Sequence, residues 1–280
     1  MPGTHDRQRL RLSPEFKNQI VGLIRFSYPA KGGFAKGFDS AEQAEAFLYE
    51  PARLERRFHL FEKMCLPALQ AQGDGAFTLV ILTGDTLPDS AKARLKGHLK
   101  TLADGRLVTL PTKPHYGAMK AALRQVAPGK ASHRTSFRLD DDDALASDYI
   151  ARLRARAEQV HALGQGQPVA IAFNRGLYVR LQDSGNEVFD AVERTPLSVG
   201  SALVAPIGQE NNIYARNHRF LPQFFDTVSE AATPTWIRTI HADNDSDPFI
   251  QGKSHMWDDA QIDAALKKGF AQSMSDLKAL

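Results

Sequence analysis

Apolar and polar residues alternate in blocks along the first 165 residues. Short continuous apolar runs predict strands buried on both faces, and longer segments with apolar residues every three or four positions predict helices. The predicted strands cover residues 20–27, 77–82, 107–110 and 134–139. The helices predicted to follow them cover residues 54–72, 89–103, 116–126 and 148–161, the first with a kink at Pro67. This alternation indicates an α/β fold with a central, mostly parallel sheet flanked by helices.

The pattern after residue 165 is less regular, with turn signals and short apolar runs. Residues 168–173 and 177–181 are predicted to form a strand pair. No linker rich in Pro or Gly separates two folding units, so we expect a single domain over residues 1–280. Its parts are expected to be a strand–helix half at about 18–165, an irregular region at about 166–250 and a helical tail at 251–280.

Composition narrows the class of protein. The chain has 280 residues, of which 42% are hydrophobic and 24% charged, as in an ordinary globular protein. No apolar run reaches the ~18–20 residues of a membrane helix, and residues 1–12 lack the apolar core of a signal peptide. Cys65 is the single cysteine, which excludes an intrachain disulfide and a cysteine-rich zinc site. A cytoplasmic location is therefore expected.

The charge balance is mildly basic. Thirty-five Lys and Arg against 32 Asp and Glu give a net charge of +3, which suits an anionic small ligand. The basic residues are spread along the chain and form no stripe of the kind that binds nucleic acid, so no nucleic-acid partner is expected. Arg152, Arg154 and Arg156 are interpreted as a solvated helix face. Peripheral association with a membrane is left open.

Four consecutive carboxylates, Asp140 to Asp143, are the strongest chemical signal. They follow a predicted strand directly and so lie at the carboxyl edge of the sheet. Like charges repel, so a positive group must offset them if they converge, and removing Asp142 is expected to relieve that repulsion. Mg²⁺ and Mn²⁺ prefer carboxylate oxygens and keep positions open for phosphate. The alternative is an acidic loop that favours a helix N-terminus.

Residues 139–145, Leu-Asp-Asp-Asp-Asp-Ala-Leu, resemble the metal-binding DxD signature of glycosyltransferases with the GT-A fold. The chain is closer still to bacterial GT-A-type proteins described as rhamnosyltransferases. The stretches that carry this resemblance are residues 24–27, 57–67, 139–145 and 235–241. Together they extend from about residue 20 to 245. The DxD motif alone is common, and its combination with the other stretches is more specific.

The resemblance implies a glycosyltransferase that moves a sugar, rhamnose in this family, from a dTDP-, UDP- or GDP-linked donor to a hydroxyl of a glycan or other small acceptor. Mn²⁺ or Mg²⁺ would bridge the diphosphate and the DxD carboxylates. Asp140 would face the ribose or a metal-bound water, Asp142 would bind the metal, and Asp143 would support the metal or the acceptor side. Asp141 is an addition relative to many members, which leaves the register open by one residue.

The resemblance also assigns weaker candidates. Arg25 and Asp85 end the first two strands, where the nucleotide base is received; the alternatives are an ion pair for Arg25 and a turn or cap for Asp85. Lys120 and Arg124 lie one helical turn apart near the expected diphosphate. They are more often plain surface charges, and Arg57 is interpreted in the same way.

His241 follows the apolar residues 236–240 and opens a polar segment. Related enzymes often use a late histidine as a third metal ligand or a diphosphate contact, whereas a lone histidine is more often structural. We expect His241 to face the loop Asp140–Asp143. A base must also deprotonate the acceptor if the enzyme inverts, and the carboxylates considered are Asp143, Asp190, Glu193 and Glu210. His218 is expected to fix a loop rather than perform chemistry.

Two other classes compete with a glycosyltransferase. A different Mg²⁺-dependent phosphoryl-transfer enzyme, such as a nucleotidyltransferase or nuclease, would distribute its acidic residues over several strands. A non-enzymatic metal- or carbohydrate-binding protein would tend to be all-β, with spaced Asp, Asn and Gly ligands. The single acidic cluster disfavours the first class, and the strand–helix alternation disfavours the second.

Overall fold

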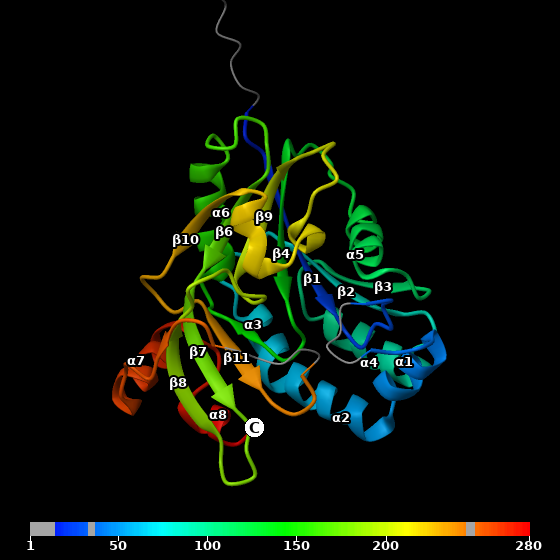
Figure 1. The fold of residues 1–280 in the computed structure, drawn as a ribbon, viewed down its shortest axis with the longest axis vertical. Coiled ribbons are helices and arrows are strands. Elements are labelled where there is room, and N and C mark those ends of the chain that lie inside the picture. Colours follow the sequence, from blue (N-terminus) through cyan, green and yellow to red (C-terminus); the bar gives the residue numbers. More distant parts are fainter. Residues whose placement is uncertain (1–14, 33–36, 245–249) are drawn as a thin grey trace, which may run out of the picture.

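The structure, a computed structural model, describes residues 15–32, 37–244 and 250–280. In these residues the strands form two sheets, and the larger has the order β10-β6-β9-β4-β1-β2-β3 (Figure 1). Its parallel block consists of β1 (Asn18–Arg25), β2 (Thr78–Gly84), β3 (Gly105–Leu110) and β4 (His133–Leu139). The strands that extend it are β6 (Val169–Phe173), β9 (Ser201–Pro206) and β10 (Asp226–Glu230). Strand β9 runs antiparallel to β4 and β6, so the sheet is mostly parallel, as expected.

The smaller sheet has the order β12-β8-β7-β11-β5. Its strands are β5 (Ala144–Leu145), β7 (Arg175–Arg180), β8 (Glu187–Val192), β11 (Trp236–Ile240) and β12 (Lys253–Ser254). Because β4 belongs to the larger sheet and β5 to the smaller, the four aspartates between them form the crossing from one sheet to the other. The acidic loop is therefore held at both ends by strand pairing.

Helices cover the sheets. The α-helices are α1 (Ala41–Leu48), α2 (Pro51–Leu60), α3 (Leu66–Gln70), α4 (Asp89–Leu99), α5 (His115–Arg124), α6 (Tyr149–Val160), α7 (Asp259–Gly269) and α8 (Met274–Lys278). A π-helical turn, η1 (Phe61–Cys65), joins α2 to α3, and the 3₁₀ turns η2 (Ile213–Ala215) and η3 (His218–Gln223) follow β9. In the described parts of the chain, none of these helices is both long and apolar enough to cross a membrane.

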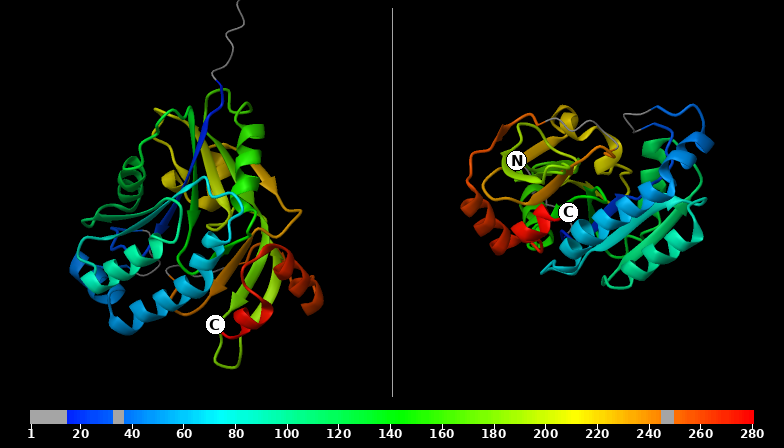
Figure 2. Two further views of the ribbon diagram at one scale, coloured as in Figure 1. Left: turned by 180° about the vertical axis from the view of Figure 1, so that it is seen from behind. Right: turned by 90° about the horizontal axis from the view of Figure 1, so that it is seen from below.

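The continuous apolar runs of β1 and β2 are buried on both faces. In β1, Ile20 and Ile24 pack in the cluster that contains residues of α2, α3 and α4, whereas Val21 and Leu23 pack with residues of α5 on the other face. Figure 2 shows α2, α3 and α4 together in its view from behind. Helices on both faces explain why these strands carry no polar alternation. The predicted α/β class with a flanked, mostly parallel sheet is confirmed.

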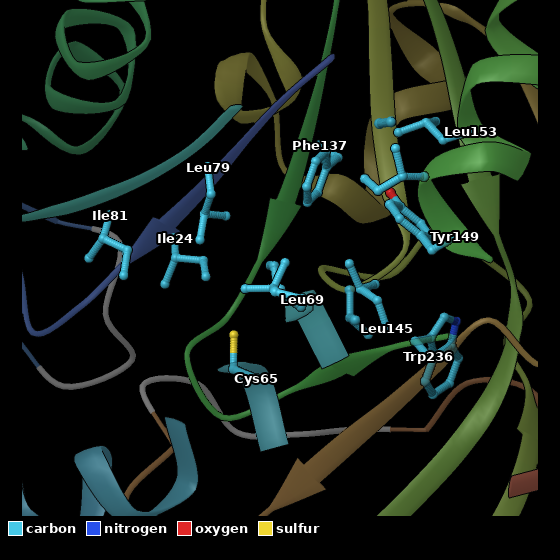
Figure 3. Close-up of a cluster of buried hydrophobic side chains, with 14 of the residues drawn as sticks. Ile24, Cys65, Leu69, Leu79, Ile81, Phe137, Leu145, Tyr149, Leu153 and Trp236 are labelled. Carbon is cyan, nitrogen blue, oxygen red and sulfur yellow. The ribbon is translucent and has the colours of Figure 1, made fainter. Parts of the chain in front are cut away.

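The helix predicted over residues 54–72 is interrupted at a different place. The helical run begins at Pro51 and widens into the π turn η1, where the amide of Leu66 donates to the carbonyl of Phe61. Pro67 then lies in the first turn of α3, where its missing N–H needs no partner. The wider turn thus comes ahead of the proline, and Figure 3 shows Cys65 and Leu69 from this region among the buried side chains of the sheet.

The prediction that residues 168–173 and 177–181 pair with each other is wrong. Both are strands, but β6 pairs with β9 and β10, whereas β7 pairs with β8 and β11. Only Asn174 separates β6 from β7. One residue is too short for a hairpin turn, so the chain continues from one sheet into the other. The partners come from residues 187–240, which the local pattern does not specify.

Gly176 of β7 lies directly under the Trp236 ring of β11, and a Cβ built at Gly176 would come within 2.2 Å of the ring. Trp236 cannot move away easily, because its Nε1 donates to the carbonyl of Phe173 at 2.7 Å. We expect Gly176→Ala to lower the free energy of unfolding by roughly 1–3 kcal/mol or more. As a control, Gly97→Ala in α4, where the Cβ meets open space, should raise it by about 0.5–1 kcal/mol. Urea unfolding of both variants is the measurement, and equal effects would contradict the packing argument.

Candidate active site

The acidic loop lies at the topological switch point of the larger sheet. From β1 the chain proceeds to β2 and β3 on one side, and it returns to place β4 on the other side of β1. Ligands of α/β sheets bind in the crevice outside the carboxyl ends of the strands at such a point. A cavity of about 470 Å³ lies there. Its lining includes Arg25 at the end of β1, Arg138 of β4, all four aspartates, and residues of β11 and of the chain around β9.

Arg57 of α2 supplies the positive charge that four adjacent carboxylates require. Its Nε donates to Oδ2 of Asp141 at 3.1 Å and its Nη1 donates to Oδ2 of Asp142 at 3.0 Å, while Nη2 pairs with Oδ1 of Asp141. Arg57 is only 5% exposed. The interpretation of Arg57 as a surface charge is therefore wrong. The residue lies on the buried face of α2, one turn from the buried Arg53, and that face is turned toward the acidic loop.

Asp142 is the most densely hydrogen-bonded of the four aspartates. Besides Arg57, its Oδ2 contacts Nε2 of His241 at 2.9 Å and accepts from Nδ2 of Asn244 at 3.2 Å. Nδ1 of His241 accepts from the amide of Asp243, so Nε2 carries the proton and donates. Burial opposes the charge of Asp142, but Arg57 and His241 outweigh it and hold the pKa of this carboxyl below its ordinary range. The expected proximity of His241 to the acidic loop is confirmed.

The pKa of Asp143 is shifted in the opposite direction from that of Asp142. Its Oδ1 accepts from the amide of Thr239 at 3.0 Å, and its Oδ2 is buried without a hydrogen-bond partner among the described residues. Burial and the neighbouring Asp142 raise the pKa of Asp143 well above its ordinary value, although Arg238 of β11 opposes the rise. Burial would lower the pKa of Arg238, but Asp143 and other neighbours outweigh it and raise the pKa. Asp143, in the loop between β4 and β5, and Arg238 of β11 therefore stabilise each other's charged forms, although among the described residues they make no hydrogen bond or close ion pair with each other.

Arg138 and Asp140 are neighbouring residues of the cavity lining. Asp140 is half-buried, with Oδ1 3.9 Å from Nη2 of Arg138. The Arg138 guanidinium lies over the ring of Tyr214, 4.9 Å from its centroid. The hydroxyl of Tyr214 donates to the carbonyl of Leu23 at 2.6 Å and so ties this wall to β1. A cation held over an aromatic face in this way is fixed in position.

Two histidines of the lining are held neutral. Burial and the charges of Arg25 and Arg138 lower the pKa of His115 to about 3. Burial and Arg138 likewise lower the pKa of His218 well below its ordinary value. Nδ1 of His115 is 3.4 Å from Nη1 of Arg25, and Nδ1 of His218 is 3.5 Å from Nη1 of Arg138. At neutral pH both rings therefore offer hydrogen bonds but no charge.

Sequence reasoning missed part of this lining. Arg238 stands inside the otherwise apolar strand Trp236–Ile240, and a charge at such a position was a signal for a buried role. His115 begins α5 and Asn244 follows His241 in a polar segment. Neither carries a sequence signal that separates it from other surface residues. Their position follows from strand order rather than from any motif.

Four of the candidate residues, Asp85, Lys120, Arg124 and Glu210, lie elsewhere. Lys120 and Glu210 pair with each other, and Arg124 also pairs with Glu210, in a second cavity of about 280 Å³. Asp85 follows β2 directly, as expected, but it is exposed and does not line the main cavity. The structure thus brings Arg25, Asp140, Asp142, Asp143 and His241 together and leaves Asp85, Lys120, Arg124 and Glu210 outside.

The other carboxylates considered as bases hold structure together. Oδ1 of Asp190 accepts from the amides of Met256 and Trp257 at 2.8 and 2.9 Å. Glu193 accepts from the hydroxyl of Tyr178 at 2.6 Å. Both are buried and outside the lining of the main cavity.

The fit of a divalent cation can be judged from the donor set. Among the described residues no three His, Cys, Asp or Glu side chains converge closely enough to hold an ion by themselves. Asp142 and His241 do converge, with Oδ2 and Nε2 2.9 Å apart. Mg²⁺ is commonly held by one or two carboxylates together with water and substrate phosphates. The pair therefore fits an ion that arrives with a diphosphate, provided that the ring proton of the neutral His241 moves from Nε2 to Nδ1 and leaves the Nε2 lone pair for the ion.

Residues 19–253 match the family described as "Putative rhamnosyl transferase". None of the curated proteins matches the sequence. Among solved structures, S. aureus TarS is similar at 12% identity and a TM-score of 0.44, over 80% of this chain and 37% of TarS. TarS 1-349 in complex with UDP is similar at 10% identity and a TM-score of 0.44, over 79% of this chain and 60% of that one. A "putative nucleotide-diphospho-sugar transferase" from Desulfovibrio desulfuricans G20 is similar at 10% identity and a TM-score of 0.36, over 81% and 82%. The chain spans less than two thirds of both TarS chains.

Proposed function

We propose a specific reaction for this chain, which belongs to the family described as "Putative rhamnosyl transferase" and is a glycosyltransferase. The reaction is the metal-dependent transfer of a sugar, rhamnose, from a nucleotide-diphosphate donor to a hydroxyl of a glycan or other small acceptor. The donor nucleotide is dTDP, UDP or GDP, and the cation is Mn²⁺ or Mg²⁺.

The observation that carries the proposal is the position of the acidic loop. Asp140 to Asp143 lie at the switch point where β1 and β4 end, with Arg25 on the β1 side and His241 against Asp142. A nucleotide diphosphate bound in that crevice places its phosphates beside the carboxylates, which can hold them only through a cation. An acidic cluster confined to one loop also supports this reaction over a nuclease or nucleotidyltransferase.

The roles of the side chains follow from their surroundings. Asp142 and His241 would hold the cation against the diphosphate, Asp140 would face the ribose or a metal-bound water, and Arg25 would receive the nucleotide. Asp85, also expected to receive the nucleotide, is exposed and lies outside the lining of the main cavity. The cation, when bound, stabilises the charge that develops on the leaving nucleoside diphosphate. Arg57 keeps Asp142 ionised and fixed in place, because its guanidinium holds the carboxylate by a hydrogen bond.

Asp143 is proposed as the group that accepts the acceptor's proton. Its raised pKa makes the ionised carboxylate a stronger base than an ordinary aspartate, and its Oδ2 is without a partner among the described residues. Glu210 has no part in this proposal, because its ion pairs with Lys120 and Arg124 hold it in the second cavity.

A thermal-shift panel of dTDP-rhamnose, UDP-glucose and GDP-mannose, each with Mn²⁺ or with EDTA, tests the function. A donor at about 100 times its Kd stabilises the fold by about 2.7 kcal/mol, which is several degrees in Tm for a chain of this size. We expect such a shift for one donor, and only with Mn²⁺. Equal shifts in EDTA would contradict the proposed metal dependence of donor binding. No shift with any donor would remove the nucleotide-sugar reaction itself.

A further inference from the structure

We propose that the acceptor of this enzyme carries an anionic group, a phosphate or a carboxylate, near the hydroxyl that receives the sugar, and that Arg238, Arg138 and Ser198 bind that group. The inference rests on the proposed function, because donor and acceptor are taken to share the main cavity. It assigns an acidic acceptor class and a binding site for it on the wall opposite β1.

The first observation is a set of buried polar groups that lack partners. Arg238 is 7% exposed, yet among the described residues its guanidinium makes no hydrogen bond or ion pair. Ser198 is 3% exposed and its Oγ has no partner, and the buried Nε of Arg138 has none either. Buried polar groups are almost always hydrogen-bonded. Because all three residues line one cavity, a ligand with several acceptor oxygens would satisfy them together.

The second observation is the charge of the lining. Five arginines against four aspartates give +5 − 4 = +1, from Arg25, Arg57, Arg138, Arg216 and Arg238 against Asp140 to Asp143. His115 and His218 add nothing, because burial and the neighbouring arginines lower the pKa of each and hold both rings neutral. A divalent cation and the diphosphate of a nucleotide sugar cancel each other. The surplus positive charge therefore remains after the donor and its metal are bound, and a negative group on the acceptor matches it.

The third observation is the position of these polar groups in the fold, on elements other than those that receive the donor. The donor belongs at the switch point between β1 and β4. Ser198 precedes β9, Arg238 lies on β11 of the smaller sheet, and the exposed Arg216 follows η2 at the rim, stacked 4.4 Å from the centroid of Phe224. Arg138 lies between the two sides. The groups without partners thus gather on the side that the donor leaves free.

The experiment measures whether an anion binds in addition to the donor nucleotide. Protein saturated with Mg²⁺ and the nucleotide-sugar donor that stabilises it is titrated in a calorimeter with inorganic phosphate, with D-glucuronate and with neutral D-glucose. We expect an anion to bind to this complex and glucose to bind at least tenfold more weakly. Phosphate stronger than glucuronate identifies a phosphorylated acceptor, and the reverse order identifies an acidic sugar.

Variants locate the site. Arg238→Gln should weaken anion binding about tenfold or more, since a charged hydrogen bond to the anion is lost. Arg106→Gln, an exposed arginine of β3 paired with Asp104, is the control and should change nothing. If Arg238→Gln fails to fold, Ser198→Ala and Arg138→Gln give the same readout.

Two outcomes overturn the inference. Either no anion binds once the nucleotide-sugar donor and Mg²⁺ are in place, or binding is unchanged in the folded variants. The first would mean that the diphosphate itself uses these arginines, which leaves the glycosyltransferase reaction intact. Failure of the nucleotide-sugar donor to bind would instead count against the proposed function.

Discussion

Asp142→Asn is expected to lower kcat/KM for sugar transfer by at least about 100-fold while the chain still folds. The substitution keeps the shape of the side chain but removes the negative charge that holds the cation against the diphosphate, and losses of this size are typical when one preorganised electrostatic contact is removed. The measurement is release of the nucleoside diphosphate in the presence of donor, acceptor and Mn²⁺, with circular dichroism to verify the fold. Transfer near the wild-type rate would contradict the role assigned to Asp142.

The matched control is Asp89→Asn, in the first turn of α4, where the carboxylate is fully exposed and pairs only with Lys92. It removes the same charge far from the acidic loop and should leave transfer unchanged. Asp142 could act by holding a cation or by its contacts with Arg57 and His241. An assay of the wild-type enzyme in excess chelator distinguishes these two roles. Full activity there, with Asp142→Asn inactive, would mean that the carboxylate acts through Arg57 and His241 rather than through a cation.

Charge counting alone predicts that loss of Asp142 relieves repulsion and leaves stability equal or higher. The contacts argue the other way. Oδ2 of Asp142 is surrounded by donors from Arg57, His241 and Asn244, and an amide in its place turns one N–H toward them. Leaving buried donors without an acceptor costs roughly 1–3 kcal/mol, so Asp142→Asn should be somewhat less stable than the wild type.

The part of the fold that the sequence predicts well is the part decided by local pattern. The runs at β1 and β2 are apolar because both of their faces are covered. The acidic loop after β4 stands out in the sequence because four adjacent like charges repel one another. The smaller sheet is different. It joins β5, two residues long, to β11, which lies 90 residues further along the chain. No local periodicity specifies such a pairing, because its energy comes from contacts between distant segments.

The residues of the candidate site likewise fall into two groups, those that local sequence pattern predicts and those whose position depends on packing. Asp142 and His241 are found because each ends an apolar strand at the same edge of the structure. Lys120 and Arg124 share a helix face, as their spacing predicts, but spacing does not say whether that face turns toward the acidic loop or toward Glu210. For Arg57 the sequence offers three arginines within five positions of α2, and only packing decides that Arg53 and Arg57 are buried and Arg56 is not.

Arg57→Met is expected to be the most destabilising of these changes, by roughly 3–5 kcal/mol. Methionine fills much of the space of the arginine stem, but Asp141 and Asp142 then lose the guanidinium that balances both of them in a buried site. Urea unfolding at pH 7 measures the loss. The adjacent Arg56→Met is the matched control, because Arg56 has a side chain that is 55% exposed and pairs with Asp243 at the surface. An exposed pair contributes at most about 1 kcal/mol.

The effect of Arg57→Met should also depend on pH with a defined sign. Arg57 and His241 hold the pKa of Asp142 below its ordinary value against the effect of burial, so this carboxyl stabilises the fold above the unfolded pKa of about 3.9 and loses that contribution as the pH falls below it. Without Arg57 the carboxyl is protonated more readily in the folded state, and protonation removes the buried charge. The stability difference between wild type and Arg57→Met should therefore be largest near pH 7 and shrink as the pH falls through 4, whereas the small difference for Arg56→Met stays small throughout. A difference that is constant from pH 7 to pH 4 would mean that Arg57 acts by packing and not by balancing the acidic loop.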